Sequence, residues 1–570
     1  MKVVIIGGVA GGATAAARIR RLNENAEIII FEKTGYVSFA NCGLPYHVSD
    51  VIKDKNKLIL HTPTSFLERF NIIAKVNHEV IDIDPINKYV TVKNLKNDDV
   101  FIEKYDKLIL SPGAKPLIPP FFKYSDKTFT LKTLEDTFRI KDYIKYNNVK
   151  SAAVIGGGYI GVEMVENLKR LDLDVSLIEL NSQVLTSLDE DMVSFVHSYM
   201  IAKGINLYLS VEVTNMEVNN NEVLTTLNNG ITLNTDIVIL TAGISPNTEL
   251  AKKINLELGL KNSIIVDKKM QTSVEDIYAV GDAVEIKNYI TGENTLISLA
   301  GPANKQGRIA ADNICNVDSE YDGSIGTSIL KLFDMSIAST GINEKICKKD
   351  NYKYEKIILS PLAHAGYYPD AKVLTLKLIY EKETLRILGS QIVGFEGVDK
   401  RIDVISTAIR GGIKADKLNE LDLAYAPPYS SAKDPINLAG YIVDNIEKGI
   451  IKQVHYEHII NTDIIKTDII NTDNSVILLD TRTEAEYNYE KADGFINIPL
   501  DNLRNRISEL DKSKKIYVMC QSGLRSYLAC RILIQNGFDA YNFSGGYRLY
   551  SSIHKNRQMA MHQYNCGKDK

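Results

Sequence analysis

The stretch SFANCGLPYH, residues 38–47, places one cysteine, Cys42, shortly after a predicted strand and a glycine-rich turn. A redox-active thiol must either pair with a second sulfur or be oxidised alone. The stretch holds no second cysteine, and His47 stands five residues further on. The residues NCGLPY have the pattern of a helix start, which puts Asn41 or Cys42 near a positive helix end that favours a thiolate. From these residues alone, a buried structural cysteine is an equal alternative.

A second candidate thiol, Cys520, begins the stretch CQSGLR directly after a predicted strand and before an amphipathic helix. Backbone amides of such a loop and the positive helix end can stabilise a sulfur anion. Cysteine phosphatases need C-x5-R to surround a phosphate, whereas Arg525 gives C-x4-R here. The shorter cradle favours a persulfide sulfur. Cys530 on the following helix is predicted to lie in the core, and Cys566 lies in a polar tail.

The elements that position Cys42 belong to a duplicated βαβ pattern that recurs about 150 residues later. The second copy carries the complete dinucleotide fingerprint, a glycine turn followed by an acid at the end of the next strand. The acid, Glu179, is predicted to accept a ribose 2′-hydroxyl and to repel a 2′-phosphate, which favours NADH over NADPH. The glycines are Gly156, Gly158 and Gly161.

The first copy departs from the fingerprint, because Val9 stands where a glycine normally lets the backbone approach a pyrophosphate. Neighbouring glycines are candidates to compensate, and Glu32 supplies the expected ribose acid. A glycine turn that closes a sheet without a ligand is the alternative for either copy. The glycines of the first turn are Gly7, Gly8, Gly11 and Gly12.

Chain length, net charge and cysteine content exclude several classes of protein. At 570 residues the chain predicts three or four domains, and its net charge of -4 argues against nucleic acid or a membrane surface as a partner. No apolar run is long enough to span a bilayer, and the sequence predicts a cytoplasmic protein. Six cysteines without a CxxC pair predict neither a disulfide framework nor a metal site.

Four motifs together resemble the coenzyme A (CoA) disulfide reductases, a single-cysteine branch of the two-dinucleotide flavoprotein disulfide reductases. They are SFANCGLPY, GGVAGGATAAARIRRL, LAGPANKQGR and AYAPPYSSAKDP, and the resemblance covers residues 1–448. The related NADH oxidases and peroxidases typically have SFLSCG and oxidise their cysteine to sulfenic acid. The variant FANCGLPY favours the disulfide branch.

The resemblance implies FAD at the first turn and NAD(P)H at the second. The stretch DIYAVGDA, residues 276–283, would complete the FAD site with Gly281 and Asp282. Gly113 lies in one of the two segments in which the chain passes from one nucleotide-binding unit to the other. Cys42 would rest as a mixed disulfide with CoA, reduced by hydride that passes from nicotinamide through flavin.

Other residues match functional positions of the resembled family. Tyr367 and Tyr425 match tyrosines that reach the active site from the partner subunit of a homodimer, and packing at the dimer interface is their alternative role. Positions implied to contact CoA are Arg18, Arg21, Ser38 and Asn41. The two arginines share a helix face, and stabilising the helix dipole is the other interpretation of them.

Residues 473–556 resemble a single rhodanese domain, carried by LLDTRTEAEY, INIPL, the Cys520 loop and FSGGYRLY. Asp480 and Arg482 match its structural acid and arginine pair. The segment before INIPL departs from the motif that is usual in rhodanese domains, and Tyr550 stands where these domains have a tryptophan. An inert domain is the alternative, although such domains normally lose the cysteine that this chain keeps.

The predicted fold class is α/β, with two Rossmann-like domains, an α+β dimerisation domain and a C-terminal α/β rhodanese-like domain. The predicted enzyme is an FAD-dependent NAD(P)H oxidoreductase acting on CoA disulfide, CoA persulfide or polysulfide, and the sequence does not decide among these. An NADH oxidase or peroxidase, or a sulfur-carrier or redox-sensing protein, are the alternatives. Predicted boundaries are 1–115 with 245–325 for FAD, 116–244 for NAD(P)H, 326–448 for dimerisation, 449–472 for a linker, 473–556 for the rhodanese-like domain and 557–570 for a tail.

Overall fold

A computed structural model describes residues 1–460 and 476–565. The chain forms two compact units, the first of residues 1–184 with 205–326 and the second of residues 185–204 with 327–570. Cys566 lies outside the described residues.

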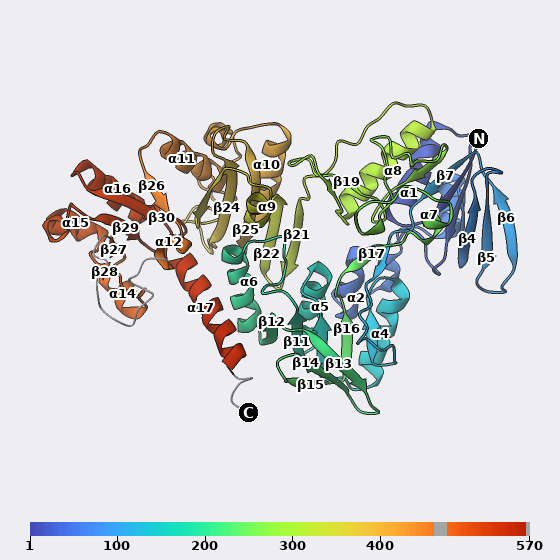
Figure 1. Cartoon of the computed structure of the whole chain (residues 1–570), viewed down its shortest axis with the longest axis horizontal. Coiled ribbons are helices and arrows are strands. Elements are labelled where there is room, and N and C mark those ends of the chain that lie inside the picture. Colours follow the sequence, from blue (N-terminus) through green and yellow to red (C-terminus); the bar gives the residue numbers. More distant parts are fainter. Residues whose placement is uncertain (461–475, 566–570) are drawn as a thin grey trace. The chain divides into compact units, whose positions relative to one another are not determined.

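The first unit contains two parallel five-stranded sheets, in the orders β18-β7-β1-β2-β3 and β12-β11-β10-β16-β9 (Figure 1). Their central strands are continuous apolar runs such as KVVII and SAAVI, as expected for strands covered by helices on both faces. The first sheet contains β1 (Lys2–Ile6), β2 (Glu27–Glu32), β3 (Ile73–Val76), β7 (Lys107–Leu110) and β18 (Ile277–Ala279), and the second contains β9 (Thr128–Thr130), β10 (Ser151–Ile155), β11 (Asp174–Glu179), β12 (Ile205–Leu209) and β16 (Ile237–Leu240).

Smaller antiparallel sheets and helices complete the first unit. The helices are α1 (Ala10–Leu22), α2 (Leu44–Val48), α3 (Pro63–Phe70), α4 (Leu134–Tyr146), α5 (Tyr159–Lys169), α7 (Glu249–Lys253) and α8 (Ala300–Ile314). The strands are β4 (His78–Asp84), β5 (Tyr89–Asn94), β6 (Val100–Lys104), β8 (Ala114–Pro116), β13 (Val213–Val218), β14 (Val223–Leu227), β15 (Thr232–Thr235), β17 (Ile244–Pro246), β19 (Ile286–Lys287) and β20 (Asn294–Thr295).

The second unit contains an antiparallel sheet, in the order β21-β22-β25-β24-β23, and a parallel sheet, in the order β26-β30-β29-β27-β28. The antiparallel part contains β21 (Ser328–Leu332), β22 (Met335–Gly341), α9 (Glu344–Lys349), β23 (Tyr354–Leu359), β24 (Leu374–Glu381), β25 (Ile387–Gly394), α10 (Val398–Arg410) and α11 (Pro435–Glu447). The parallel part contains β26 (Lys452–Val454), α12 (Tyr456–Ile460), β27 (Val476–Asp480), α14 (Glu484–Tyr489), β28 (Ile496–Asn497), α15 (Leu500–Arg506), β29 (Lys515–Met519), α16 (Leu524–Gln535), β30 (Asp539–Phe543) and α17 (Gly546–Asn565). The predicted α/β fold class is confirmed.

Two segments are more structured than the sequence indicates. The range expected as a linker contains β26, which pairs with β30 at the edge of the parallel sheet, and α12. Strand β26 has three residues, which are too few to show the alternation of apolar and polar residues by which a strand is predicted. The expected tail begins inside α17, which continues to Asn565.

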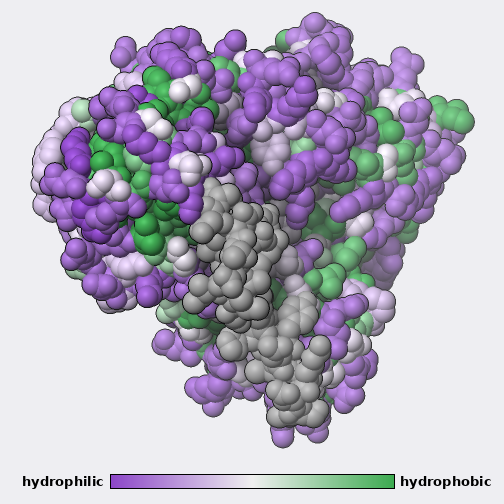
Figure 2. Space-filling view, turned by 60° about the vertical axis from the view of Figure 1, so that its left-hand side comes forward, coloured by the Kyte–Doolittle hydropathy of each residue, from purple (hydrophilic) through white to green (hydrophobic). Residues whose placement is uncertain are grey.

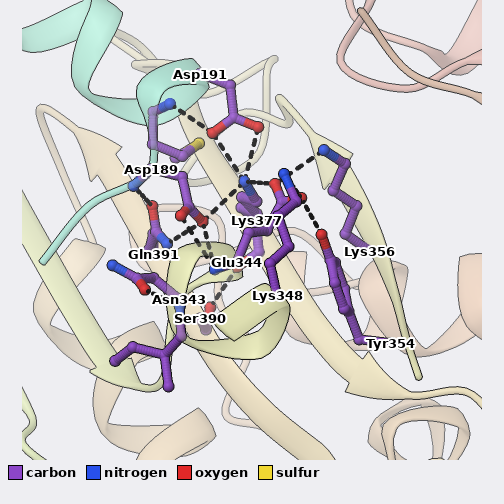
Figure 3. A network of polar contacts seen from close by, with 12 residues as sticks. Asp189, Asp191, Asn343, Glu344, Lys348, Tyr354, Lys356, Lys377, Ser390 and Gln391 are labelled. Atoms are coloured by element: carbon purple, nitrogen blue, oxygen red, sulfur yellow. Dashed lines mark hydrogen bonds and ion pairs between the residues drawn. The ribbon is translucent and has the colours of Figure 1, made fainter. Parts of the chain in front are cut away.

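Residues 185–204 leave the second Rossmann-like sheet after β11 and return to it at β12, yet they pack within the second unit. Their helix is α6 (Glu190–Ala202). Asp189 and Asp191 at its start gather with Glu344 around the buried ammonium of Lys377 (Figure 3). The Lys377 nitrogen lies 2.9 Å from Asp189 and 2.7 Å from Asp191, and it also contacts Glu344.

These three carboxylates have the spacing of a cation site, and the Lys377 ammonium is bound among them. Burial alone would lower the pKa of Lys377, but the three carboxylates raise it above its ordinary value. Lys356 adds a second ammonium, 2.8 Å from Glu344 and 2.7 Å from Glu457 in α12. Ion pairs of the sheet residues Lys356 and Lys377 therefore connect α12 and α6 to the antiparallel sheet.

Helix α6 also packs against α17 of the parallel-sheet part. Ser194 and Ser552 hydroxyls lie 2.8 Å apart, and His197 Nδ1 lies 2.8 Å from Asn556 Oδ1. Arg557 pairs with Glu190 at 2.9 Å. The C-terminal helix is thus bound to a segment that the sequence places in the NAD(P)H-binding range.

The face shown in Figure 2 is mainly hydrophilic, with hydrophobic residues in small groups. In the described parts of the chain, we find no helix with the length and apolar character that crossing a bilayer requires.

Replacing Lys377 by methionine is expected to lower the free energy of unfolding by about 3–5 kcal/mol, because three buried carboxylates lose their shared ammonium. Urea unfolding followed by circular dichroism measures the effect. The control is Lys382→Met, which removes an exposed pair with Glu355 and should cost less than about 1 kcal/mol. Equal effects of the two changes would contradict the role given to Lys377.

Candidate active site

The first unit contains a cavity of about 720 Å³ at the carboxyl end of its first parallel sheet. This volume lies within the range of about 300–1,000 Å³ that is usual for ligand and cofactor pockets. The cavity is lined by residues predicted for FAD from four separate parts of the sequence, namely Gly7, Gly11, Glu32, Gly113, Gly281 and Asp282.

The first glycine turn is tightly packed. Gly7 has a φ of 94°, a conformation that side chains rarely adopt. A Cβ on Gly8 would lie 2.5 Å from Val37, and one on Gly11 would lie 2.8 Å from Val280. Gly8 and Gly11 are therefore needed for packing, and Gly11 also lines the cavity beside Val9. A Cβ on Gly12 would meet the carbonyl of Gly7.

The second turn repeats this packing. Gly156 has a φ of 110°, and a Cβ there would lie 2.5 Å from the carbonyl of Thr241. A Cβ on Gly161 would meet the carbonyl of Gly156. Gly158 has no atom within 4 Å of its Cβ position, which leaves room for a phosphate where the fingerprint expects one.

Each acid predicted to bind a ribose is hydrogen-bonded to its own turn. Glu32 accepts a bond from the Gly8 amide at 2.9 Å, and Glu179 accepts one from the Gly157 amide at 2.6 Å. The second oxygen of Glu179 accepts bonds from the backbone and side chain of Asn181. A carboxylate has about four acceptor positions, so both acids keep capacity for a hydroxyl.

Cys42 lies in a 3-10 turn, Asn41–Gly43, that leads directly into α2, and it is exposed. Desolvation by surrounding protein atoms raises the pKa of its thiol, and the charges of Glu163 and Asp282 raise it further, while Lys132 lowers it. The helix start is present as expected, but the protein groups around Cys42 do not favour the expected thiolate.

Glu163 was not identified from the sequence, although it stands two residues after the last glycine of the second fingerprint. It projects from α5 toward α2, where the Tyr46 hydroxyl donates to it at 3.3 Å. Burial raises the pKa of Glu163 to about 7. Glu163 shares its helix face with Glu166 and Asn167, so its position in the sequence carried no distinct signal.

The residues predicted to contact CoA are placed differently from one another. Asn41 lines the cavity, and its buried Oδ1 has no hydrogen-bond partner among the described residues. Ser38 is buried and adopts a φ of 49°. Arg18 pairs with Asp312 at 2.6 Å, and Arg21 is exposed. Neither arginine lines the cavity.

In the second unit, the structure brings Tyr367 and Tyr425 together. Their hydroxyls lie 2.7 Å apart, although 58 residues separate them in the sequence. Both rings are exposed, at 76% and 48%. The hydrogen bond between the two hydroxyls raises the pKa of Tyr367, so Tyr367 keeps its phenolic proton at neutral pH.

Cys520 lies at the carboxyl end of β29, and its loop leads into α16. Its buried sulfur accepts hydrogen bonds from the Gly523 amide at 3.1 Å and from the Ser526 hydroxyl at 3.3 Å. Gly546 lies so close to the carbonyl of Cys520 that a side chain there would clash. Cys530 is buried in the core, and burial raises the pKa of its thiol.

Residues 1–307 match the family described as Pyridine nucleotide-disulphide oxidoreductase, which is more than half of the chain. The chain belongs to this family. Residues 327–435 match the dimerisation domain of these oxidoreductases, and residues 466–552 match the Rhodanese-like domain. The protein is accordingly an oxidoreductase with an appended rhodanese-like domain, and the family implies FAD and NAD(P)H as cofactors.

Several relatives within the family are similar over most of this oxidoreductase. A CoA disulfide reductase of Staphylococcus aureus is 39% identical and aligns with 77% of this chain and 99% of its own. Reduced CoADR-RHD of Bacillus anthracis is 43% identical with a TM-score of 0.93, covering 98% of both chains. An NAD-dependent persulfide reductase from A. fulgidus is 36% identical with a TM-score of 0.89, covering 96% of this chain and 100% of its own.

Replacing Glu163 by glutamine is expected to increase the rate at which iodoacetamide alkylates Cys42 at pH 8, by about threefold. Glu163 is negative above its pKa of about 7 and then raises the pKa of Cys42, so removing it increases the thiolate fraction. At pH 6 Glu163 is largely protonated, and the variant should match the wild type.

Mass spectrometry of the Cys42 peptide from the reduced, FAD-loaded protein measures this rate. The control is Glu68→Gln on the exposed face of α3. A difference of the same size at pH 6 and pH 8 would disprove the charge effect.

Proposed function

We propose that this oxidoreductase uses NADH to reduce CoA disulfide or CoA persulfide through Cys42, and that its rhodanese-like domain carries sulfane sulfur on Cys520. The observation that carries the proposal is the presence of two separate sulfur sites in one chain. Cys42 follows the FAD-type turn, and Cys520 lies in a complete donor loop. The relatives named for CoA disulfide and persulfide reduction support this substrate class.

The residues around the large cavity suit a bound FAD. Glu32 and Asp282 lie on its wall, and the unpartnered Asn41 Oδ1 is a buried acceptor in the same place. FAD would supply electron transfer between a nicotinamide and a sulfur centre. The overall reaction is NADH, a proton and CoA persulfide giving NAD⁺, CoA thiol and hydrogen sulfide, or giving two CoA thiols when the substrate is CoA disulfide.

The chain's own steps are nucleophilic attack and proton transfer. The Cys42 thiolate attacks the sulfur–sulfur bond of the substrate and becomes joined to CoA as a mixed disulfide, while a thiolate or sulfide leaves. In a homodimer, which the dimerisation domain supports, the paired hydroxyls of Tyr367 and Tyr425 would protonate that leaving group.

We expect the enzyme to prefer NADH over NADPH by at least tenfold in kcat/KM, because the buried Glu179 carboxylate would repel a 2′-phosphate. Initial rates with both nucleotides test this directly. Glu179→Gln should reduce the preference while keeping the hydrogen bond from Gly157. Equal efficiency of the two nucleotides in the wild type would disprove the assignment of Glu179.

The test of the function is anaerobic oxidation of NADH by the FAD-loaded protein, with CoA persulfide and CoA disulfide as alternative substrates. Cys42→Ser is expected to abolish both reactions, whereas Cys315→Ser, outside both sites, should retain them. A tenfold higher kcat/KM for persulfide, about 1.4 kcal/mol, would make sulfur reduction the main task.

Cys520→Ser is expected to lower the release of sulfide from donors that must first load the rhodanese-like domain, without changing the reduction of CoA disulfide. Sulfide is measured for each of several sulfur donors. Sulfide release that is unchanged with every donor would argue against sulfur transfer by Cys520.

A further inference from the structure

The charged residues around Cys520 indicate which sulfur donors its loop accepts. Arg525, which ends the loop, is the residue expected to help hold an anionic group there. Its two terminal nitrogens instead bind the two oxygens of Glu486, each at 2.7 Å. This fork-to-fork arrangement is a strong form of ion pair, in which the carboxylate of Glu486 compensates the positive charge of Arg525.

Glu486 is fixed from its other side as well. It is the third residue of α14, where its Oε2 accepts bonds from the Thr483 amide at 2.9 Å and from the Thr483 hydroxyl at 3.0 Å. The bond from Arg525 lowers the pKa of Glu486 to about 2, so the carboxylate is charged at neutral pH. Glu486 is therefore positioned by a capping box, a local motif, and not by the presence of a ligand.

Arg482 is the second arginine at this edge of the sheet, because it follows β27, which pairs with β29 at Asp480 and Met519. Its guanidinium is buried and binds the Asp480 carboxylate at 2.9 Å and 2.7 Å. It also donates to the carbonyl of Glu490. Both arginines are thus paired with carboxylates within the domain.

The groups that do face the sulfur are uncharged. Cys520 Sγ is contacted by the Gly523 amide and the Ser526 hydroxyl, and the loop's other side chains are Gln521, Ser522 and the exposed Leu524. Such a loop can stabilise one sulfur anion by hydrogen bonds. It offers no free cation from Arg525 or Arg482 to a second or third negative charge.

We infer that the Cys520 loop accepts sulfur from thiol persulfides and discriminates against dianionic donors of the thiosulfate type, with Glu486 as the residue that sets this specificity. The inference rests on the proposed sulfur-transfer function and adds the class of donor. Glu486 acts through Arg525 and is a positioning residue.

Sulfur transfer from a thiol persulfide and sulfur transfer from thiosulfate differ in the charge of the leaving group. In the first, the Cys520 thiolate attacks the terminal sulfur of R–S–SH, the bond between the two donor sulfurs breaks, and R–S⁻ leaves while the proton stays on the transferred sulfur. In the second, the thiolate attacks the outer sulfur of thiosulfate, and sulfite leaves with two negative charges. No external oxidant or reductant is needed in either case. Only the second places two negative charges on the leaving group, and an unpaired cation beside the loop would stabilise them.

The experiment measures transfer of sulfur to Cys520 in the full-length, FAD-loaded protein, with CoA persulfide and with thiosulfate as donors. Release of CoA and of sulfite gives kcat/KM for each donor. The wild type is expected to favour CoA persulfide. Glu486→Gln should raise the efficiency with thiosulfate relative to persulfide by about tenfold, because Arg525 becomes free to meet the leaving sulfite.

Glutamine at this position keeps the capping box, so the variant is expected to fold as the wild type does. The matched control is Glu484→Gln, which removes the same charge from an exposed position of the same helix. It should leave the donor ratio unchanged, and this excludes a general effect of net charge.

A wild type that favours thiosulfate would overturn the inference without any variant. A donor ratio that is unchanged in Glu486→Gln, or that changes equally in both variants, would overturn it too, while transfer from persulfide would leave the proposed function standing. If no donor loads Cys520 in the wild type, sulfur transfer itself is disproved and the inference with it.

Discussion

The ammonium of Lys377 is shared by three carboxylates that come from two elements distant in the sequence. Asp189 and Asp191 begin α6, and Glu344 begins α9. Three carboxylates cannot remain charged together in a buried site without such a partner, because each loses its hydration. The pairing therefore stabilises residues 185–204 against the antiparallel sheet. Helix α17 of the rhodanese-like domain contacts the same helix α6 through Ser194 and Ser552.

A second constraint occurs twice, in the two nucleotide-binding turns. In each, a glutamate at the end of the second strand accepts a bond from a glycine amide of the turn. The glutamate holds the turn in shape before any ribose arrives, which is a structural reason for an acid at this position. Specificity for the ribose then depends on the acceptor capacity that remains. Glu179 uses its second oxygen on Asn181, and so its orientation is fixed more firmly than that of a free side chain.

The sequence was sufficient to predict local geometry where it depends on neighbours in the chain, while the chemical roles of these residues stay predictions. The glycine turns, the acids that follow them and the Cys520 loop each occupy short stretches whose spacing defines their geometry. Contacts between distant segments were not accessible in this way. The hydrogen bond between Tyr367 and Tyr425, the approach of Glu163 to Tyr46 and the packing of α6 all join residues that no local period relates. The edge strand β26 was missed because three residues carry no pattern, and its pairing with β30 supplies the stability that its sequence does not.

The two sulfur sites differ in the charge that their surroundings favour. Around Cys42, desolvation by nearby protein atoms and the charges of Glu163 and Asp282 raise the pKa of the thiol, which favours an uncharged sulfur. A mixed disulfide is uncharged, which supports the proposal that Cys42 rests joined to a substrate thiol. Around Cys520, two hydrogen-bond donors point at the sulfur and favour an anion, as a bound persulfide would be.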